Sequence, residues 1–260
     1  MWFSIGRRYA PAAVAPEHAL AERGAARRRG GFNRFVFWSR LLDWRNQTLT
    51  PNPDAIYLMP FIDTTDEPIV LEIPAAEGGS ITGSVDDAWQ TAVEDVGLAG
   101  VDQGKGGRYL ILPPGYEDEV PDGYIAMPAA TRRTYALLRS NLSSGSPEDV
   151  AAALAYGKRV KLYPLSQADA PPPTTFVDAA DVVFDATISY DVRFFEALDR
   201  CVQAEPWLAR DKAMIDTLKT IGIEKGKPFA PRPQAGGRQG LPAHRARERA
   251  GQPVLVGNDL

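Results

Sequence analysis

The sequence predicts an α+β protein whose core is an antiparallel β-sandwich of jelly-roll-like design, with helices toward the C-terminus. The chain has 22 prolines and 23 glycines among 260 residues, a composition that favours many turns and short strands. Stretches of alternating polarity separated by turn signals fill residues 51–130. Helix capping signals and helical spacing of apolar residues become frequent only after Ser146. Strands followed by helices indicate the α+β class.

The predicted strands alternate apolar and polar side chains with a period of two. In "EPIVLEIP", Ile69 and Ile73 lie on one face and Glu72 on the other. In "GGRYLIL", Tyr109 and Ile111 share a face and the leucines take the opposite one. The sequence "PDG" that follows is a strong turn signal. Both stretches are therefore expected to be strands with a buried face.

Three helices are expected in the second half of the chain. Ser146 is placed as an N-cap, with Pro147 in the first helical position and Asp149 as the acidic capping partner. Gly222 occupies a C-cap position after the last apolar repeat. The predicted helices cover residues 146–163, 191–204 and 206–221. The stretch "FNRFVFWSRLLDW" also fits a short helix, with Asn33 as its cap.

The chain divides into a central domain and two aperiodic ends. Residues 1–31 form a disordered Arg/Ala-rich segment, residues 32–231 a single sandwich-plus-helix domain, and residues 232–260 a disordered basic tail. The net charge of −4 does not indicate nucleic-acid binding. No apolar run reaches the length of about 18 residues that a membrane span needs. No export signal is visible in the first 30 residues.

Few residues are suited to nucleophilic or metal chemistry. The two histidines, His18 and His244, lie in the aperiodic ends, so a Ser-His-Asp arrangement in the core is not expected. Cys201 is the single cysteine, which rules out a disulfide framework and a thiolate metal site. The sequence "GKGGRY" lacks the pattern of a phosphate loop. We therefore predict no metal and no cofactor.

Carboxylates and aromatic residues are the remaining candidates, and they form two groups. The first contains Asn52, Asp54 and Tyr57, and the second, in "SVDDAWQTAVEDVG", contains Asp86, Asp87, Trp89, Gln90 and Asp95. On a strand, Asp87 and Trp89 would share a face. A carboxylate beside an indole suits sugar binding, and in an apolar pocket it suits a general acid. The alternative is that the aspartates close turns and Trp89 fills the core.

Six motifs in order resemble the bacterial family with domain of unknown function 1254. They are "LTPNPDAIYLMPFID", "EPIVLEIP", "DDAWQTAVEDVG", "GGRYLILPPGYEDEVPDGY", the Thr131…Arg139 pair and "TIGIEKGKPF". The resemblance covers residues 32–231 and includes the family's Asn-x-Asp-x-x-Tyr element at Asn52, Asp54 and Tyr57. It implies a β-sandwich with attached helices, frequent export and a carbohydrate-related role. The second domain that often follows in this family, domain of unknown function 1214, is not visible here, and the chain's end looks truncated or frame-shifted.

The leading hypothesis is a β-sandwich that binds a small molecule or carbohydrate, with processing of that carbohydrate by carboxylates as an extension. In this hypothesis Asp54 and Asp87 are the catalytic carboxylates, and Asn52, Tyr57, Trp89 and Gln90 bind the ligand in the same cleft. The alternatives are a structural or assembly module and an inactive fragment. The expected partners are a small-molecule or carbohydrate ligand and a second copy in a homo-oligomer. An exposed Trp89 would favour binding, and a buried Trp89 would favour the structural alternative.

Overall fold

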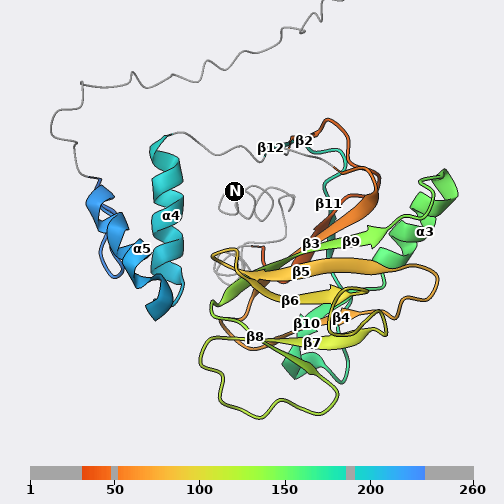
Figure 1. Ribbon diagram of the computed structural model, residues 1–260, viewed down its shortest axis with the longest axis horizontal. Helices are drawn as coiled ribbons and strands as arrows, with labels where there is room; N and C mark the ends of the chain where they lie inside the picture. The colour runs from red at the N-terminus through yellow and green to blue at the C-terminus, as the bar shows by residue number, and fades with distance from the viewer. Residues whose placement is uncertain (1–30, 48–51, 186–190, 232–260) are drawn as a thin grey trace, which may run out of the picture.

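The computed structural model of the protein describes residues 31–47, 52–185 and 191–231. Two sheets are packed face to face, with helices at their ends (Figure 1). The six-stranded sheet has the order β11-β1-β3-β9-β5-β6, made of β1 (Arg34–Phe37), β3 (Ala55–Asp63), β5 (Ile81–Asp87), β6 (Ala92–Gly97), β9 (Arg133–Asn141) and β11 (Phe176–Asp178). The predicted disordered ends, residues 1–30 and 232–260, lie outside the described residues.

The second sheet has four strands in the order β10-β4-β7-β8. They are β4 (Ile69–Ile73), β7 (Gly107–Leu112), β8 (Ile125–Pro128) and β10 (Lys161–Pro164). A small third sheet pairs β2 (Asn46–Gln47) with β12 (Phe184–Asp185). The β1–β11, β7–β8 and β2–β12 pairs are parallel and the other pairs antiparallel. The predicted α+β class is confirmed, and the sheets are mixed rather than purely antiparallel.

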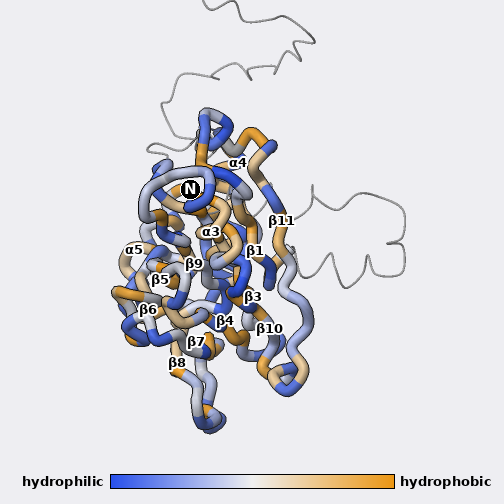
Figure 2. The backbone as a smooth tube through the Cα atoms, turned by 90° about the vertical axis from the view of Figure 1, so that its right-hand side faces the viewer, coloured by the Kyte–Doolittle hydropathy of each residue, from blue (hydrophilic) through white to orange (hydrophobic). Residues whose placement is uncertain are grey.

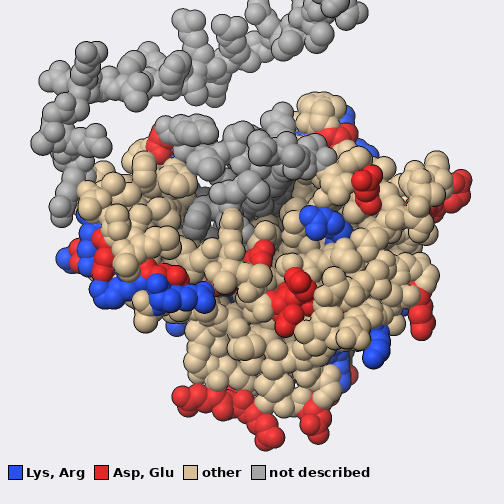
Figure 3. Space-filling model, in the orientation of Figure 1, with Lys and Arg blue, Asp and Glu red and all other residues tan. Residues whose placement is uncertain are grey.

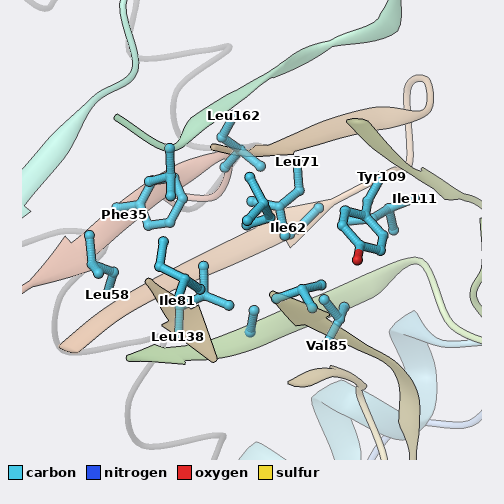
Figure 4. Close-up of a cluster of buried hydrophobic side chains, with 14 of the residues drawn as sticks. Phe35, Leu58, Ile62, Leu71, Ile81, Val85, Tyr109, Ile111, Leu138 and Leu162 are labelled. Carbon is cyan, nitrogen blue, oxygen red and sulfur yellow. The ribbon is translucent and has the colours of Figure 1, made fainter. Parts of the chain in front are cut away.

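The main core fills the space between the two large sheets (Figure 4). Leu58 and Val85 reach it from one sheet, and Leu71 and Ile111 reach it from the other. Each such side chain contributes about 1.5–3 kcal/mol when fully buried. The predicted faces of β4 and β7 are confirmed, because Ile69, Ile73 and Tyr109 also point into this core. Figure 2 shows apolar and polar residues interleaved along the strands.

Helix α3 (Pro147–Gly157) begins as the sequence predicts. The Ser146 side chain accepts a hydrogen bond from the backbone N–H of Asp149 at 3.2 Å, which satisfies one free donor of the first turn. The Asp149 carboxylate accepts from the N–H groups of Ser143, Ser144 and Gly145 instead of closing a reciprocal capping box. The loop before α3 is thereby tied to the helix start.

Two segments predicted as helix are strands. Residues 34–37 form β1, in which Phe35 and Phe37 enter the main core while Val36 points to the opposite face. Helix α3 ends at Gly157, and Lys161–Pro164 form β10, which pairs with β4. In both segments the pairing with a distant strand overrides the local helical pattern.

The C-terminal helices lie at one end of the sandwich (Figure 1). They are α4 (Val192–Ala204), α5 (Lys212–Thr217) and the 3-10 turns η2 (Ala209–Asp211) and η3 (Leu218–Ile221). A further turn, η1 (Leu165–Gln167), follows β10. The predicted helix over residues 191–204 is confirmed, and the one over 206–221 is divided among η2, α5 and η3. Gly222 ends η3 in the left-handed conformation, as expected, with a φ of 88°.

Buried polar contacts attach these helices to the sheet. The Glu205 carboxylate, 1% exposed, accepts a hydrogen bond of 2.7 Å from the backbone N–H of Arg132, just before β9. Burial raises the pKa of the Glu205 carboxyl above its usual range. The Lys225 ammonium donates to three carbonyl oxygens at the end of α4, those of Val202, Gln203 and Glu205. The C-terminal end of α4 is therefore bound to the β9 side by Glu205 and to the following segment by Lys225.

Candidate functional site

The first predicted group lies at the start of β3. The Asn52 side-chain oxygen accepts a hydrogen bond of 2.8 Å from the backbone N–H of Asp54, which closes a turn on the chain itself. Asp54 is exposed in that turn. Tyr57 lies within β3 and is buried on the side of the sheet that faces away from the main core. Asn52 therefore closes a turn, as the alternative interpretation of this group predicts. Tyr57 lies on the side of the six-stranded sheet that faces away from the main core.

The second predicted group lies where β5 ends. Asp87 is 1% exposed. Its Oδ1 accepts the backbone N–H groups of Trp89 and Thr91, at 2.8 and 2.9 Å, and its Oδ2 accepts from the Arg210 guanidinium at 3.3 Å. These contacts occupy both oxygens of the carboxylate. Asp87 therefore shapes the turn after β5 and binds the segment that carries η2.

Trp89 and Gln90 are not on a strand, so the expected shared face of Asp87 and Trp89 does not form. Trp89 is partly buried against the apolar cluster of the C-terminal helices, which includes Val202 and Ile215. Gln90 is exposed in the turn, with a φ of 62°. For the indole, the packing favours the structural alternative over a stacking platform.

The two groups lie at opposite ends of the six-stranded sheet. Residue Ala55, next to Asp54, pairs with Asn141 at one end of β9, and Asp87 pairs with Thr134 near its other end. Seven residues of strand separate these levels, which is about 23 Å at the usual rise per residue. Asp54 and Asp87 therefore do not share one cleft, and the predicted pair of catalytic carboxylates is not assembled.

Members of both groups nevertheless reach one surface, which we call the outer face. It is the side of the six-stranded sheet that points away from the four-stranded sheet. Strand register arranges the residues of this face in three rows, each in the strand order β1, β3, β9, β5 and β6. The first row, which starts just after β1, is Trp38, Tyr57, Arg139, Thr82 and Gly97, and the second is Val36, Met59, Leu137, Ser84 and Asp95. The third row is Arg34, Phe61, Tyr135, Asp86 and Ala92. The β1 and β3 side is mostly apolar, and the β5 and β6 side carries hydroxyls and carboxylates.

Arg139 lies in an end row of this face, on β9, the central strand of the five. Its guanidinium lies over the ring of Tyr57, 5.4 Å from the centroid, and its Nε donates to the Tyr57 hydroxyl at 3.3 Å. Within the described part of the chain, Arg139 makes no ion pair with a carboxylate. Stacking and the hydrogen bond hold the guanidinium plane in place while both Nη groups keep their donors.

Two carboxylates lie beside one another on the β5 and β6 side. Asp86 is hydrogen-bonded to Tyr135, and Asp95 accepts from the Ser84 hydroxyl at 2.5 Å. Burial raises the pKa of the Asp86 carboxyl, the hydrogen bond from Tyr135 opposes that shift, and the charges of Asp87 and Asp95 add to it. Strand spacing puts Asp86 and Asp95 about 8 Å apart at their Cα positions.

Asp86 and Asp95 belong to the second predicted group because they are carboxylates near Trp89. In the structure they lie on the outer face, whereas Asp87 points inward. A register shift of β6 against β5 leaves Val93 as an extra residue opposite Val85 and Asp86, while β5 keeps its regular register with β9. The alternation along β5 sends Val85 and Asp87 inward and leaves Asp86 on the outer face. Strand alternation in "SVDD" is the signal that could have identified Asp86.

On the β1 and β3 side of the outer face, Val36, Tyr57 and Phe61 are buried. The β9, β5 and β6 side provides a fixed cation, hydroxyl groups, acceptor carboxylates and the partly exposed ring of Tyr135. These are the groups that recognise a polar ring compound with an apolar face. Among residues 31–47, 52–185 and 191–231, no cluster of three or more histidine, cysteine or acidic side chains could hold a metal ion. In the same ranges, no helix has both the length and the apolar character to cross a membrane.

The fold and the outer face define a two-sheet β-sandwich protein with helices attached at its ends. The family model "Protein of unknown function (DUF1254)" matches residues 32–164, more than half of the 260 residues, and the chain belongs to this family. The crystal structure of the VPA0106 protein from Vibrio parahaemolyticus is similar, with a TM-score of 0.56 and 18% identity over 80% of this chain. The chain spans 48% of that protein. No curated protein matches the chain.

Proposed function

We propose that this protein binds a carbohydrate or similar polyhydroxylated small molecule on the outer face of its six-stranded sheet. The observation that carries the proposal is the placement of the partly exposed Tyr135 ring beside the carboxylates Asp86 and Asp95 on one face. Sugar rings present apolar C–H faces and hydroxyl edges. The Tyr135 ring suits the first, and carboxylates accept hydrogen bonds from the second.

The experiment is calorimetric titration of the full chain with a panel of neutral and acidic disaccharides. Asp86→Asn keeps the shape and removes the charge, and it is expected to weaken binding about tenfold or more because a hydrogen bond to a charged group is lost. Asp122→Asn is the matched control, since Asp122 is an exposed carboxylate in the β7–β8 loop. Absence of binding by the parent chain to every sugar, or equal effects of the two variants, would refute the proposal.

Carbohydrate processing is the extension of this proposal, and the placement of Asp86 and Asp95 on one face supports it. Burial raises the pKa of Asp86, the direction that suits a group that donates a proton to a leaving group, and a second carboxylate such as Asp95 can assist from the same face. Hydrolysis of a bound disaccharide, followed by chromatography, tests this step. If Asp86→Asn abolished hydrolysis in a variant that still binds, Asp86 would have the acid role. Turnover unchanged in that variant would exclude it.

The structural alternative is favoured by a separate observation at the sheet end. Trp89 is packed against the C-terminal helices, and Asp87 is hydrogen-bonded to Arg210 near α5. In this alternative the sandwich serves to hold a helical unit or a second subunit. Trp89→Ala would then reduce stability and self-association without changing sugar binding. Analytical ultracentrifugation beside the same titrations separates this outcome from the inactive fragment, which would neither bind nor associate.

A further inference from the structure

Among the described residues, Arg139 on the outer face has no carboxylate partner. Arg139 in β9 stacks on Tyr57 and donates to its hydroxyl, whereas the Nε of Arg34 in β1 is buried and beyond the reach of a ligand. No described carboxylate lies within ion-pair distance of either guanidinium, although Arg40, Arg45 and Arg133 elsewhere do form such pairs. A half-buried cation without a counter-charge is costly, and an anionic ligand would offset that cost.

From this arrangement, which rests on the proposed function of the outer face, we infer that the ligand is a sugar acid. The Tyr57 ring and hydroxyl fix the orientation of the Arg139 guanidinium and leave its two Nη groups available. A guanidinium fork presented in this way matches the two oxygens of a carboxylate. The Arg139 site therefore takes the carboxylate of a uronic acid, and the neighbouring face takes the sugar ring.

The positions on the sheet favour more than one sugar ring. Strand spacing puts the Cα positions of Arg139 and Asp86 about 14 Å apart. One ring bound to Arg139 does not reach Asp86, whereas two linked rings cover the distance. The hydroxyls of such a ligand face Asp86 and Asp95.

The test compares α-1,4-digalacturonate with its neutral counterpart α-1,4-galactobiose by calorimetry of the full chain. The acid is expected to bind about ten- to hundredfold more tightly, the effect of a bidentate hydrogen-bonded charge pair. Arg139→Gln is expected to remove that preference, so that the two disaccharides bind this variant with affinities within about twofold of one another. Rising salt should reduce the preference of the parent chain. Arg108→Gln is the matched control, because Arg108 also stacks on a tyrosine, Tyr124, but on the other sheet.

The outcomes separate this inference from the proposed function. Equal binding of the two disaccharides would overturn the sugar-acid assignment while the outer face stays a sugar site. Binding of neither would overturn both. Tighter binding of galactose 1-phosphate than of digalacturonate, lost in Arg139→Gln, would assign the guanidinium to a phosphate and overturn the carboxylate. If Arg139→Gln does not fold, Arg139→Lys keeps a charge without the fork, and an unchanged preference in that variant would also overturn the inference.

Discussion

The hydrogen bonds of Asp87 lead to a specific prediction about its role. The substitution Asp87→Ala removes the acceptor of two backbone N–H groups, those of Trp89 and Thr91, beside a carboxylate that is 1% exposed. A hydrogen bond to a charged group contributes about 1.5–3 kcal/mol, and the partly exposed turn places these two near the lower limit. Arg210 is 53% exposed, so its ion pair with Asp87 adds only about 0–1 kcal/mol.

Together these contacts predict that Asp87→Ala lowers the free energy of unfolding by about 3–4 kcal/mol. A domain of this size would then melt roughly 6–16 °C lower. Asp87→Asn keeps an acceptor for the two N–H groups and loses only the contact with Arg210, so its cost is expected to be about 1 kcal/mol. Urea unfolding followed by tryptophan fluorescence measures both values. A loss below about 0.5 kcal/mol in Asp87→Ala, within the range of ordinary surface substitutions, would refute the structural role of Asp87.

Three further predictions concern capping, charge and thiol accessibility. Ser146→Ala is expected to cost about 1 kcal/mol in the free energy of unfolding, and an unchanged thermal melt would exclude Ser146 as the N-cap. Burial raises the pKa of the Glu205 carboxyl, so the folded state binds the proton of this carboxyl more tightly than the unfolded state does. The stability that this carboxyl contributes is therefore present below its ordinary pKa of 4.5 and is lost as the pH rises through its raised pKa in the folded state. Glu205→Gln should flatten the dependence of the free energy of unfolding on pH in that range. Burial raises the pKa of Cys201 to about 12, so the folded protein should react with a thiol reagent only at its unfolding rate, and rapid labelling at neutral pH would contradict the burial.

Local signals in the sequence were sufficient for features that depend on neighbouring residues. The period of two in β4 and β7 identified their buried faces, because both strands have one face in the main core. The cap at Ser146 and the left-handed Gly222 follow from chemistry within one turn. The failures are β1 and β10, whose apolar residues also fit a helical pattern in a short window. Their hydrogen bonds go to β3 and β4, which no local pattern reveals.

The candidate site was less predictable because it is assembled by long-range pairing. Tyr57 and Arg139 are 82 residues apart in sequence and meet only because β3 and β9 are neighbours in register. The same register puts Asp54 and Asp87 at opposite ends of β9, although both stand near strand ends in the sequence. Residue type alone therefore identified candidate chemistry, and strand order decided which candidates share a surface.

Asp86 and Asp87 show how much one position along a strand decides. The two carboxylates are adjacent in sequence, yet the pleat of β5 sends them to opposite sides of the sheet. Both oxygens of the inward carboxylate, Asp87, already accept hydrogen bonds from backbone N–H groups and from Arg210, so few lone pairs remain for a ligand. The outward carboxylate, Asp86, is hydrogen-bonded to Tyr135 and is partly exposed on the outer face, so it retains acceptor capacity for a ligand. The regular alternation of β5, in unbroken register with β9, decides which aspartate faces outward, and that is why the outer face, rather than the Trp89 turn, is the surface on which a function is to be tested.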